Sequence, residues 1–400
     1  MRKSKLVIFH PTSYFGGASV LFSRIYNYAI ENNVDIIYID DDNGYTKSRN
    51  VNKKQIYSID QNLNNLISED DVIICTTTQI KMLKRYLSNL TENPRVMLWV
   101  VHPYEASLHF FRGNRRVLKL PFKYATSKIL INSQHKKRKE IIKFINQYVG
   151  NSLFFMDAPC INATNYFLDT KLVANLDNII PIPYQHITFT RNEKKHIKKD
   201  NSINLSYFGR VEHFKTGPLI SLLNELSKIK DVNRIIFHII GDGQDLSRII
   251  NKFSKKMTII SLGLMENEDA KAYMKENIDI LFAMGTAAID GASLGIPTVL
   301  LNASNSARKQ RYDWLYKEQG FSLGDYSDAP WFCSPIKNLR RIIDEFNANS
   351  EELSIKSFIH VDKKHSIQNV VKHIIQNKDG TTLRLSELLK YNCFYWFYIL

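Results

Sequence analysis

The stretch between residues 279 and 297 holds the side chains and turns best suited to chemistry. It opens with an apolar run of the length of a buried strand, which Gly285 and Thr286 interrupt before a helix over 287–294. The first N–H groups of such a helix have no intrahelical acceptor, and the helix dipole adds partial positive charge. A phosphate beside this turn and a ribose beside Asp290, on the same helix, is one interpretation. The other is a helix–sheet crossover whose glycines serve only close packing.

Two cations and several glycines follow other expected strands of the second half. Arg210 and Lys215 stand five residues apart on one loop. Arginine grips phosphate oxygens through two parallel hydrogen bonds, and lysine adds a point charge. Glycines after strands let the backbone approach a ligand closely. These residues form a set suited to a nucleoside diphosphate, with the last pair flanking a base: Gly209, Gly241, Asp242, Gly243, Gly263 and Leu264.

Apolar strand-like runs alternate with amphipathic segments along the chain. The first series predicts strands at 5–10, 34–39, 71–75, 95–101, 128–131, 152–156 and 178–182, and helices from residue 18, over 79–90 and after Ser133 as an N-cap. The second predicts strands at 203–208, 234–240, 257–262, 279–284 and 298–301, with helices over 218–229, from 246, over 266–276 and over 287–294. Strands spaced by helices predict an α/β fold of two doubly wound, Rossmann-like parallel sheets.

We expect an N-terminal domain over 1–184, a polar, lysine-rich linker over 185–202, and a second domain over 203–370. Helices are expected within 350–378. Residues 371–400 form a helical and aromatic tail that either lies at a membrane interface or packs onto the first domain. Ligands of such folds bind outside the carboxyl ends of the strands, so the two domains are expected to face each other across a cleft.

The charge of the chain calls for an anionic partner. At 400 residues it carries a net charge of +15, concentrated in 112–123, 135–139 and 194–199. No zinc-finger, basic-zipper or RNA-binding signature accompanies it, so a membrane surface is preferred over nucleic acid. The alternative is a surface of solvated lysines. The cysteines are scattered, and the sequence has neither an apolar window of about eighteen residues nor a signal-peptide pattern. These features predict a cytoplasmic protein. Together with the basic charge, they predict a peripheral location on the inner face of the cytoplasmic membrane.

The motifs of the second half resemble the donor domain of GT-B glycosyltransferases, most similar to glycosyltransferase family 4. The strings that carry the resemblance lie at 207–215, 240–243, 262–263 and 290–297. The resemblance implies that Arg210 and Lys215 neutralise the donor diphosphate and that Asp290 holds the donor ribose. The family usually carries two glutamates separated by seven residues. Asp290 stands at the second of these positions and Phe282 at the first. Because the first glutamate often contacts the donor sugar, that contact is expected to be absent or to come from elsewhere.

The first half resembles the family more loosely. Gly16 and Gly17 match its glycine loop near the acceptor and the donor phosphates. His102 matches a position where the family often carries a histidine facing the donor sugar, although a lone histidine is more often structural. Glu105 on the same loop is a weaker candidate. The basic segment 112–139 has the character of the face with which related enzymes touch anionic membranes.

The resemblance implies a retaining, hexosyl-transferring enzyme of surface polysaccharide biosynthesis, such as lipopolysaccharide or capsule. It would move a sugar from a nucleoside diphosphate to a lipid-linked or polysaccharide acceptor without cofactor or metal. His102, Arg210 and Lys215 would be catalytic, the two cations and the 285–286 helix terminus stabilising the leaving group. Asp40 to Asp42 are interpreted as a loop. The alternatives are an epimerase of the same fold, a catalytically silent partner subunit (motivated by Phe282) and a nucleic-acid binder.

Overall fold

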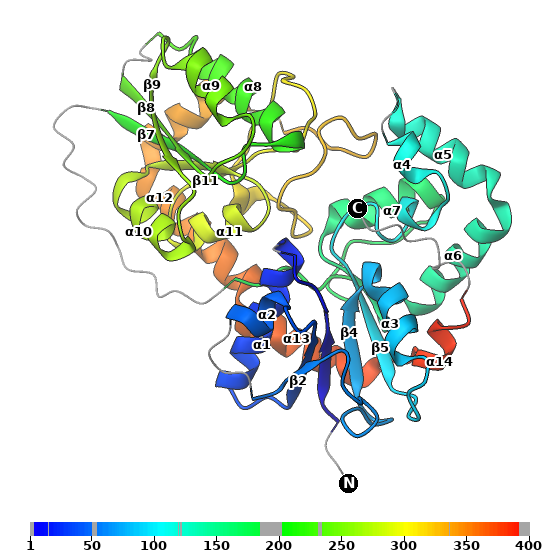
Figure 1. The fold of residues 1–400 in the computed structure, drawn as a ribbon. Coiled ribbons are helices and arrows are strands. Elements are labelled where there is room, and N and C mark those ends of the chain that lie inside the picture. Colours follow the sequence, from blue (N-terminus) through cyan, green and yellow to red (C-terminus); the bar gives the residue numbers. More distant parts are fainter. Residues whose placement is uncertain are drawn as a thin grey trace. The chain divides into compact units, whose positions relative to one another are not determined.

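The structure is a computed structural model that describes residues 4–14, 16–49, 54–118, 120, 122–184, 202–230, 234–335 and 337–391. The chain forms two compact units, each built around one parallel β-sheet (Figure 1). The first unit comprises Met1–Pro183 and Ile367–Leu400, and the second comprises Tyr184–Ser366. The expected linker lies outside the described residues except for Ser202, and so do the last nine residues of the aromatic tail.

Six parallel strands form the sheet of the first unit in the order β3-β2-β1-β4-β5-β6. They are β1 (Leu6–Phe9), β2 (Ile36–Asp40), β3 (Ile56–Ser58), β4 (Val72–Thr76), β5 (Arg95–Val100) and β6 (Leu153–Phe155). Nearly all their residues are buried, as expected for strands covered on both faces. This strand order is that of a dinucleotide-binding domain.

Helices connect these strands and cover both faces of the sheet. They are α1 (Gly17–Glu31), α2 (Tyr45–Arg49), η1 (Thr77–Gln79), α3 (Ile80–Leu87), η2 (Leu108–Phe110), α4 (Asn114–Val117), α5 (Lys123–Ser133), α6 (His135–Tyr148) and α7 (Ala158–Leu168). The end of the chain adds α13 (Ile367–Gly380) and α14 (Leu385–Leu388) to the same unit. Helix α13 packs beside α1 (Figure 1), and Ile367, Val370, Val371 and Ile374 belong to the core under β1 and β4.

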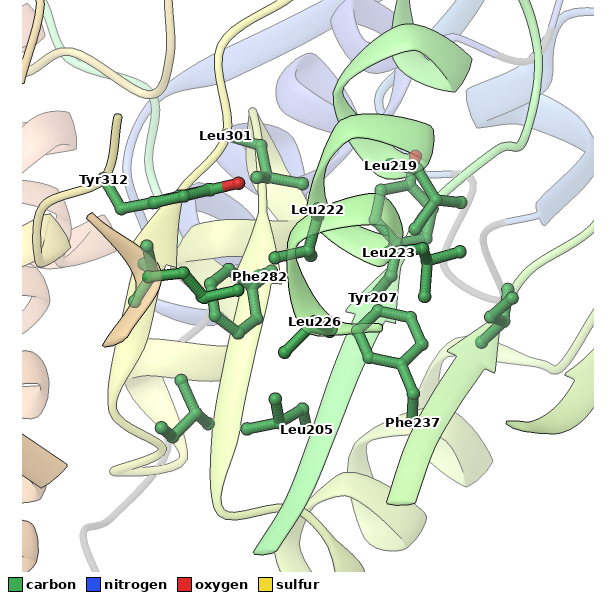
Figure 2. Close-up of a cluster of buried hydrophobic side chains, with 14 of the residues drawn as sticks. Leu205, Tyr207, Leu219, Leu222, Leu223, Leu226, Phe237, Phe282, Leu301 and Tyr312 are labelled. Atoms are coloured by element: carbon green, nitrogen blue, oxygen red, sulfur yellow. The ribbon is translucent and has the colours of Figure 1, made fainter. Parts of the chain in front are cut away.

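Five parallel strands form the sheet of the second unit in the order β11-β10-β7-β8-β9. They are β7 (Ile203–Phe208), β8 (Ile235–Ile240), β9 (Thr258–Gly263), β10 (Ile280–Ala283) and β11 (Thr298–Leu300). The helices are η4 (His213–Lys215), α8 (Thr216–Leu226), α9 (Leu246–Phe253), α10 (Asn267–Asn277), α11 (Thr286–Ser293), η6 (Leu315–Lys317) and α12 (Leu339–His365), which is kinked at Asn349. The leucines of α8 pack on β7 and β10 in the main core (Figure 2).

The expected α/β class and nearly all expected elements are confirmed, but three local predictions are wrong. Residues 128–131, expected as a strand, belong to helix α5, whose outward side is also apolar and therefore hides the helical period. Ser133 does not cap the next helix, because its Oγ donates to the Leu130 carbonyl. The segment 178–182, expected as a strand, forms only an isolated parallel β-bridge, between Phe155 and Ile179.

Among the elements that the sequence did not predict, β3 and α7 are instructive. Strand β3 is only three residues long, so no pattern could develop in it. Helix α7 carried a usable signal, because Asp157 precedes it and accepts a hydrogen bond from the Cys160 N–H at 3.0 Å, with Pro159 in the first turn. Among the described residues, no helix is both long enough and apolar enough to cross a membrane.

Candidate functional site

The strand order of the second unit gives its sheet a topological switch point, a usual position for a ligand. The chain runs outward from β7 to β8 and β9, and then returns to the other side of β7 with β10 and β11. At such a switch point the loops after the two central strands diverge and leave a crevice at their carboxyl ends. The loop 209–215 follows β7, and Gly285 and Thr286 follow β10. The sequence-predicted cations and the helix terminus therefore flank the switch point.

The loops after β7 and β8 are joined backbone to backbone. The Gly209 N–H donates to the Ile240 carbonyl at 3.0 Å, and the Val211 N–H donates to the Asp242 carbonyl at 2.9 Å. A methyl group at Gly241 would lie 2.1 Å from the Gly209 carbonyl oxygen, and one at Gly243 would lie 2.4 Å from that of Val211. Glycine is thus needed at both positions for contact between loops, whatever ligand approaches them.

Arg210 is fixed through its backbone, and its side chain is largely exposed. The buried Tyr207 hydroxyl donates to the Arg210 carbonyl at 2.7 Å. The guanidinium side chain is 61% exposed and forms an ion pair with Glu212, Nη1 to Oε1 at 2.8 Å. Neither Tyr207 nor Glu212 was singled out from the sequence, because their roles depend on the turn that the loop makes.

Lys215 ends the same loop in a different environment. It is half-buried, and its Nζ lies 3.9 Å from the place that a Cβ on Gly209 would occupy. Burial, and next the positive charge of Arg210, lower the pKa of the Lys215 ammonium. No hydrogen bond or ion pair joins this ammonium to any other described residue. A partly desolvated cation in this setting is poised to bind an anion.

The turn before α11 differs in one respect from the sequence expectation. Gly285 has a positive φ of 66°, and its N–H donates to the Leu323 carbonyl at 2.7 Å, so this amide is already used. The Thr286 amide opens the helix and has no intrahelical acceptor. Asp290 lies one turn further along and is 6% exposed. The anion site expected at this turn thus depends on Thr286 and the amide after it.

Gly263 and Leu264 follow β9, the edge strand of the sheet. Gly263 has a φ of 65°, and its carbonyl accepts the Gly241 N–H at 2.8 Å, which extends the row of joined loops. Leu264 is 84% exposed. The two residues thus lie at the same carboxyl edge as Gly209 and Gly241, but at its end, two strands away from β7.

Phe282 occupies a core position of β10. It is fully buried, and its ring meets that of Tyr312 edge to face with centroids 6.0 Å apart (Figure 2). Only Met284 and Gly285 separate β10 from α11. The position that aligns with the first family Glu is therefore a strand position facing the core.

The first unit has its own switch point, between β1 and β4. Gly16 is the N-cap of α1 and Gly17 its first residue, so the predicted glycine loop does open this helix. Thr77 begins η1 directly after β4. This switch point and that of the second sheet belong to separate compact units.

His102 follows β5 and stacks on a second histidine. The His102 and His109 rings lie 5.7 Å apart at an interplanar angle of 13°. The Tyr104 N–H donates to His102 Nδ1 at 3.2 Å. Burial lowers the pKa of His102 to about 4, and that of His109, also lowered by the His102 charge, to about 3. Both imidazoles are thus neutral near pH 7 and can act as hydrogen-bonding groups rather than as cations.

The Glu105 carboxylate is buried and anchors the loop that carries His102. It is 5% exposed, and its Oε2 accepts the Val101 N–H at 3.0 Å and the Thr77 hydroxyl at 3.1 Å. Its own N–H donates to the His102 carbonyl at 3.0 Å. Burial raises the pKa of this carboxyl to about 7, against the two hydrogen bonds that lower it. Glu105 therefore positions the loop and ties it to η1.

The raised pKa of Glu105 predicts a pH dependence of stability. Because the folded state holds its proton up to about pH 7 and the unfolded state only to 4.5, folding weakens as pH rises between these values. The change amounts to about 3 kcal/mol. In Glu105→Gln this term is absent. We expect the free energy of unfolding of the variant relative to wild type to rise from pH 4.5 to 7, measured by urea denaturation. A pH-independent difference would contradict the assignment.

The acidic run 40–42 has a structural explanation. The buried Asp40 carboxylate ends β2 and accepts the Thr12 N–H at 3.3 Å and the Lys47 N–H at 2.9 Å, which fixes two neighbouring loops. Within the described ranges, no three His, Cys, Asp or Glu side chains come together in a way that could hold a metal ion.

Comparison with known proteins identifies the architecture. No family model matches the sequence, and no curated protein matches it either. Among solved structures, Anabaena HepE in complex with UDP and glucose aligns with a TM-score of 0.56 at 11% identity, covering 94% of this chain and 99% of that one. The lipopolysaccharide outer core galactosyltransferase WaaB aligns at 0.53 and 13% identity, covering 95% and 100%.

The chain has the GT-B fold. Its two units correspond to the two Rossmann-like domains of that architecture, and their sheets carry the strand orders described above. The N-terminal domain of Candida albicans trehalose-6-phosphate phosphatase also aligns, with a TM-score of 0.54, 10% identity and coverage of 96% and 98%. At such identities the likeness establishes the fold and not the activity.

Proposed function

We propose that this GT-B protein is a glycosyltransferase that takes a hexosyl group from a nucleoside-diphosphate donor with retention of configuration. The observation that carries the proposal is Lys215, a half-buried ammonium that makes no hydrogen bond or ion pair with a described residue, on the same loop as Arg210 at the switch point of the second sheet. Two cations there suit a diphosphate better than a neutral ligand. HepE bound to UDP and glucose, which shares the fold, supports a nucleotide sugar as the donor.

The chemistry follows from where charge develops. As the bond between the sugar and the β-phosphate oxygen breaks, negative charge grows on the diphosphate. Lys215, Arg210 and the Thr286 end of α11 stabilise that charge, so the transition state is held more strongly than the bound donor. Gly263 and Leu264 flank the base, and Asp290 holds the ribose. His102, which is neutral, donates to or accepts from a sugar hydroxyl. The proposal requires no metal and no cofactor.

The acceptor in this proposal is lipid-linked or polymeric and belongs to surface polysaccharide synthesis. Lipopolysaccharide assembly by WaaB, a protein of the same fold, supports this choice. The basic surface of the first unit supports a place on the inner face of the cytoplasmic membrane, where such acceptors are presented. The assignment to glycosyltransferase family 4 belongs to the same proposal and rests on the motifs at 207–215 and 290–297.

One observation favours a second candidate, a catalytically silent partner subunit of the same fold. The residue at the place of the first family carboxylate, Phe282, is buried in the core, and the connection from β10 to α11, Met284 and Gly285, holds no carboxylate. A silent subunit would retain the nucleotide site without transferring sugar. Donor turnover separates the two candidates, and product analysis with donor alone identifies an epimerase.

The first test is a calorimetric and thermal-shift panel of UDP, GDP, TDP and ADP. We expect one diphosphate, UDP by analogy with HepE, to stabilise the protein by about 2.7 kcal/mol at one hundred times its Kd. Lys215→Met and Asp290→Ala are expected to weaken that stabilisation. Lys228→Met, which removes an exposed lysine beyond the end of α8, is the matched control. A folded protein that responds to none of the four would overturn the proposal.

A further inference from the structure

The chain between η6 and α12 returns to the carboxyl edge of the second sheet. We call residues 322–327, which make this contact, the edge strip. The Leu323 carbonyl accepts the Gly285 N–H at 2.7 Å. A methyl group at Gly324 would lie 3.3 Å from the Met284 Cβ. The edge strip therefore lies against the connection from β10 to α11, which holds no carboxylate.

Asp325 is held between the two loops of the switch point. Its carbonyl accepts the N–H of Ala303, in the loop after β11, at 2.7 Å. The next residue, Tyr326, packs its ring on that of Phe214, with centroids 5.8 Å apart, and Phe214 directly precedes Lys215. The edge strip thus contacts the turn after β10 through its first half and the loop after β7 through its second half.

The Asp325 carboxylate uses only one of its two oxygens within the described parts of the protein. The residue is 9% exposed, and its Oδ1 accepts the Tyr326 N–H at 2.6 Å and the Trp331 Nε1–H at 3.3 Å. Its Oδ2 accepts no hydrogen bond from any described residue. Burial raises the pKa of this carboxyl to about 6, against the two hydrogen bonds that lower it, so the group is mostly ionised at pH 7.5.

Asn302 places an amide group beside that carboxylate. It lies two residues beyond the end of β11 and is 5% exposed. Its Oδ1 accepts the Asp325 N–H at 3.0 Å, and its Nδ2 donates to no other described residue. Side chains buried to this extent normally have partners for their polar atoms. Here each keeps one atom for a ligand, an amide donor on Asn302 and a carboxylate acceptor on Asp325.

We propose that Asn302 Nδ2 and Asp325 Oδ2 bind hydroxyl groups of the donor sugar, in place of the first glutamate that the family usually carries. A hydroxyl group accepts from an amide and donates to a carboxylate, so both free atoms suit a neutral sugar. The inference rests on the proposed function, because it assumes a nucleoside-diphosphate sugar. Its diphosphate would lie at the two loops that the edge strip contacts, and the hexosyl group is attached to that diphosphate.

The site predicts discrimination between sugars. A donor whose hydroxyl groups reach both atoms leaves neither of them unpaired. A donor that lacks one of these hydroxyl groups leaves a buried polar atom without a partner, and sites of this kind reject such analogues strongly. Asn302 and Asp325 are therefore specificity-determining residues, whereas the cations of the switch point bind the part that all donors share.

The structural and the ligand-binding roles belong to different atoms, so substitutions can separate them. In Asp325→Asn the Oδ1 acceptor of the Tyr326 and Trp331 N–H groups is retained, and only the free oxygen is replaced, by an amide nitrogen. In Asn302→Asp the acceptor of the Asp325 N–H is likewise retained, and only the free amide is lost. Trp331→Phe keeps the ring and removes the N–H that orients Asp325.

The test is calorimetric titration of the full chain with UDP, UDP-glucose, UDP-galactose and UDP-N-acetylglucosamine. We expect Asp325→Asn and Asn302→Asp each to raise the Kd of the tightest-binding UDP-sugar by about ten-fold or more. The Kd of UDP should change less than two-fold, which a general disturbance of the site would not allow. Trp331→Phe should show a smaller loss with the same selectivity. The matched control is Asp344→Asn, which removes an exposed carboxylate paired with Arg340 on α12 and should bind like wild type.

The outcomes distinguish this inference from the proposed function. Binding of UDP-sugars that neither Asp325→Asn nor Asn302→Asp weakens would overturn the inference and leave the nucleotide site intact. Equal losses for UDP and for the UDP-sugars would also overturn it, because the two residues would then support the fold of the site and not the sugar. A wild-type protein that binds none of the four ligands would overturn the proposed function and this inference with it.

Discussion

Replacing Lys215 with methionine is expected to lower kcat for sugar transfer by about 10²- to 10³-fold, or about 3 kcal/mol of transition-state stabilisation. The ammonium is half-buried and forms no ion pair with a described carboxylate, so its charge is available to an anionic ligand. Methionine keeps most of the side-chain volume and removes the charge. The measurement is steady-state transfer or donor hydrolysis, with circular dichroism to verify the fold.

Arg210→Ala and Lys228→Met complete this experiment. Arg210 is more exposed and already shares its charge with Glu212, so we expect a loss smaller than that of Lys215→Met. Lys228 is exposed and belongs to neither loop of the switch point, so its variant should turn over like wild type. If Lys215→Met retained more than half of the wild-type kcat, the ammonium would have no role in leaving-group stabilisation.

Introducing the family carboxylate at its aligned position is expected to unfold the second unit rather than to improve catalysis. Phe282→Glu would remove an aromatic ring packed on Tyr312 and bury an ionisable group without a partner (Figure 2). The loss of packing alone costs about 3 to 5 kcal/mol, and the carboxyl group adds to it. That is comparable with the whole stability of many domains, about 5 to 15 kcal/mol.

The comparison variant is Phe282→Leu, which keeps the position apolar and is expected to cost about 1 to 2 kcal/mol. Urea denaturation followed by circular dichroism measures both. A Phe282→Glu protein as stable as Phe282→Leu would show that the side chain at 282 reaches solvent. That result would contradict the buried, edge-to-face packing of Phe282 on Tyr312.

The order of elements was predictable because parallel sheets leave strong local signals. Buried strands such as β1 and β10 are short apolar runs, and each is followed by a glycine or polar turn. The prediction was wrong at residues 128–131, where Ile129 is 69% exposed and Ile131 is buried on the same helix, α5. Apolar residues on both sides of a helix remove the amphipathic pattern on which such predictions depend.

The candidate site was predictable in its residue types but not in its contacts. Gly241 and Gly243 were expected to admit a ligand, and they instead admit the backbone of the loop 209–211. The Gly285 amide was expected to be available, and it is used by Leu323, which is 38 residues further along the chain. Both facts depend on which loops lie side by side, and one sequence without tertiary contacts does not contain that information.

The chain returns to its first unit at Ile367, and this has a consequence for folding during translation. The side chains of Ile367, Val370, Val371 and Ile374 complete the core beneath β1 and β4, but they leave the ribosome only after the whole of the second unit. The second unit, which is continuous in sequence, can therefore fold during translation, while the first waits with part of its apolar surface uncovered. Synthesis of α13, rather than completion of the first half of the chain, sets the moment at which the N-terminal strands gain their final stability.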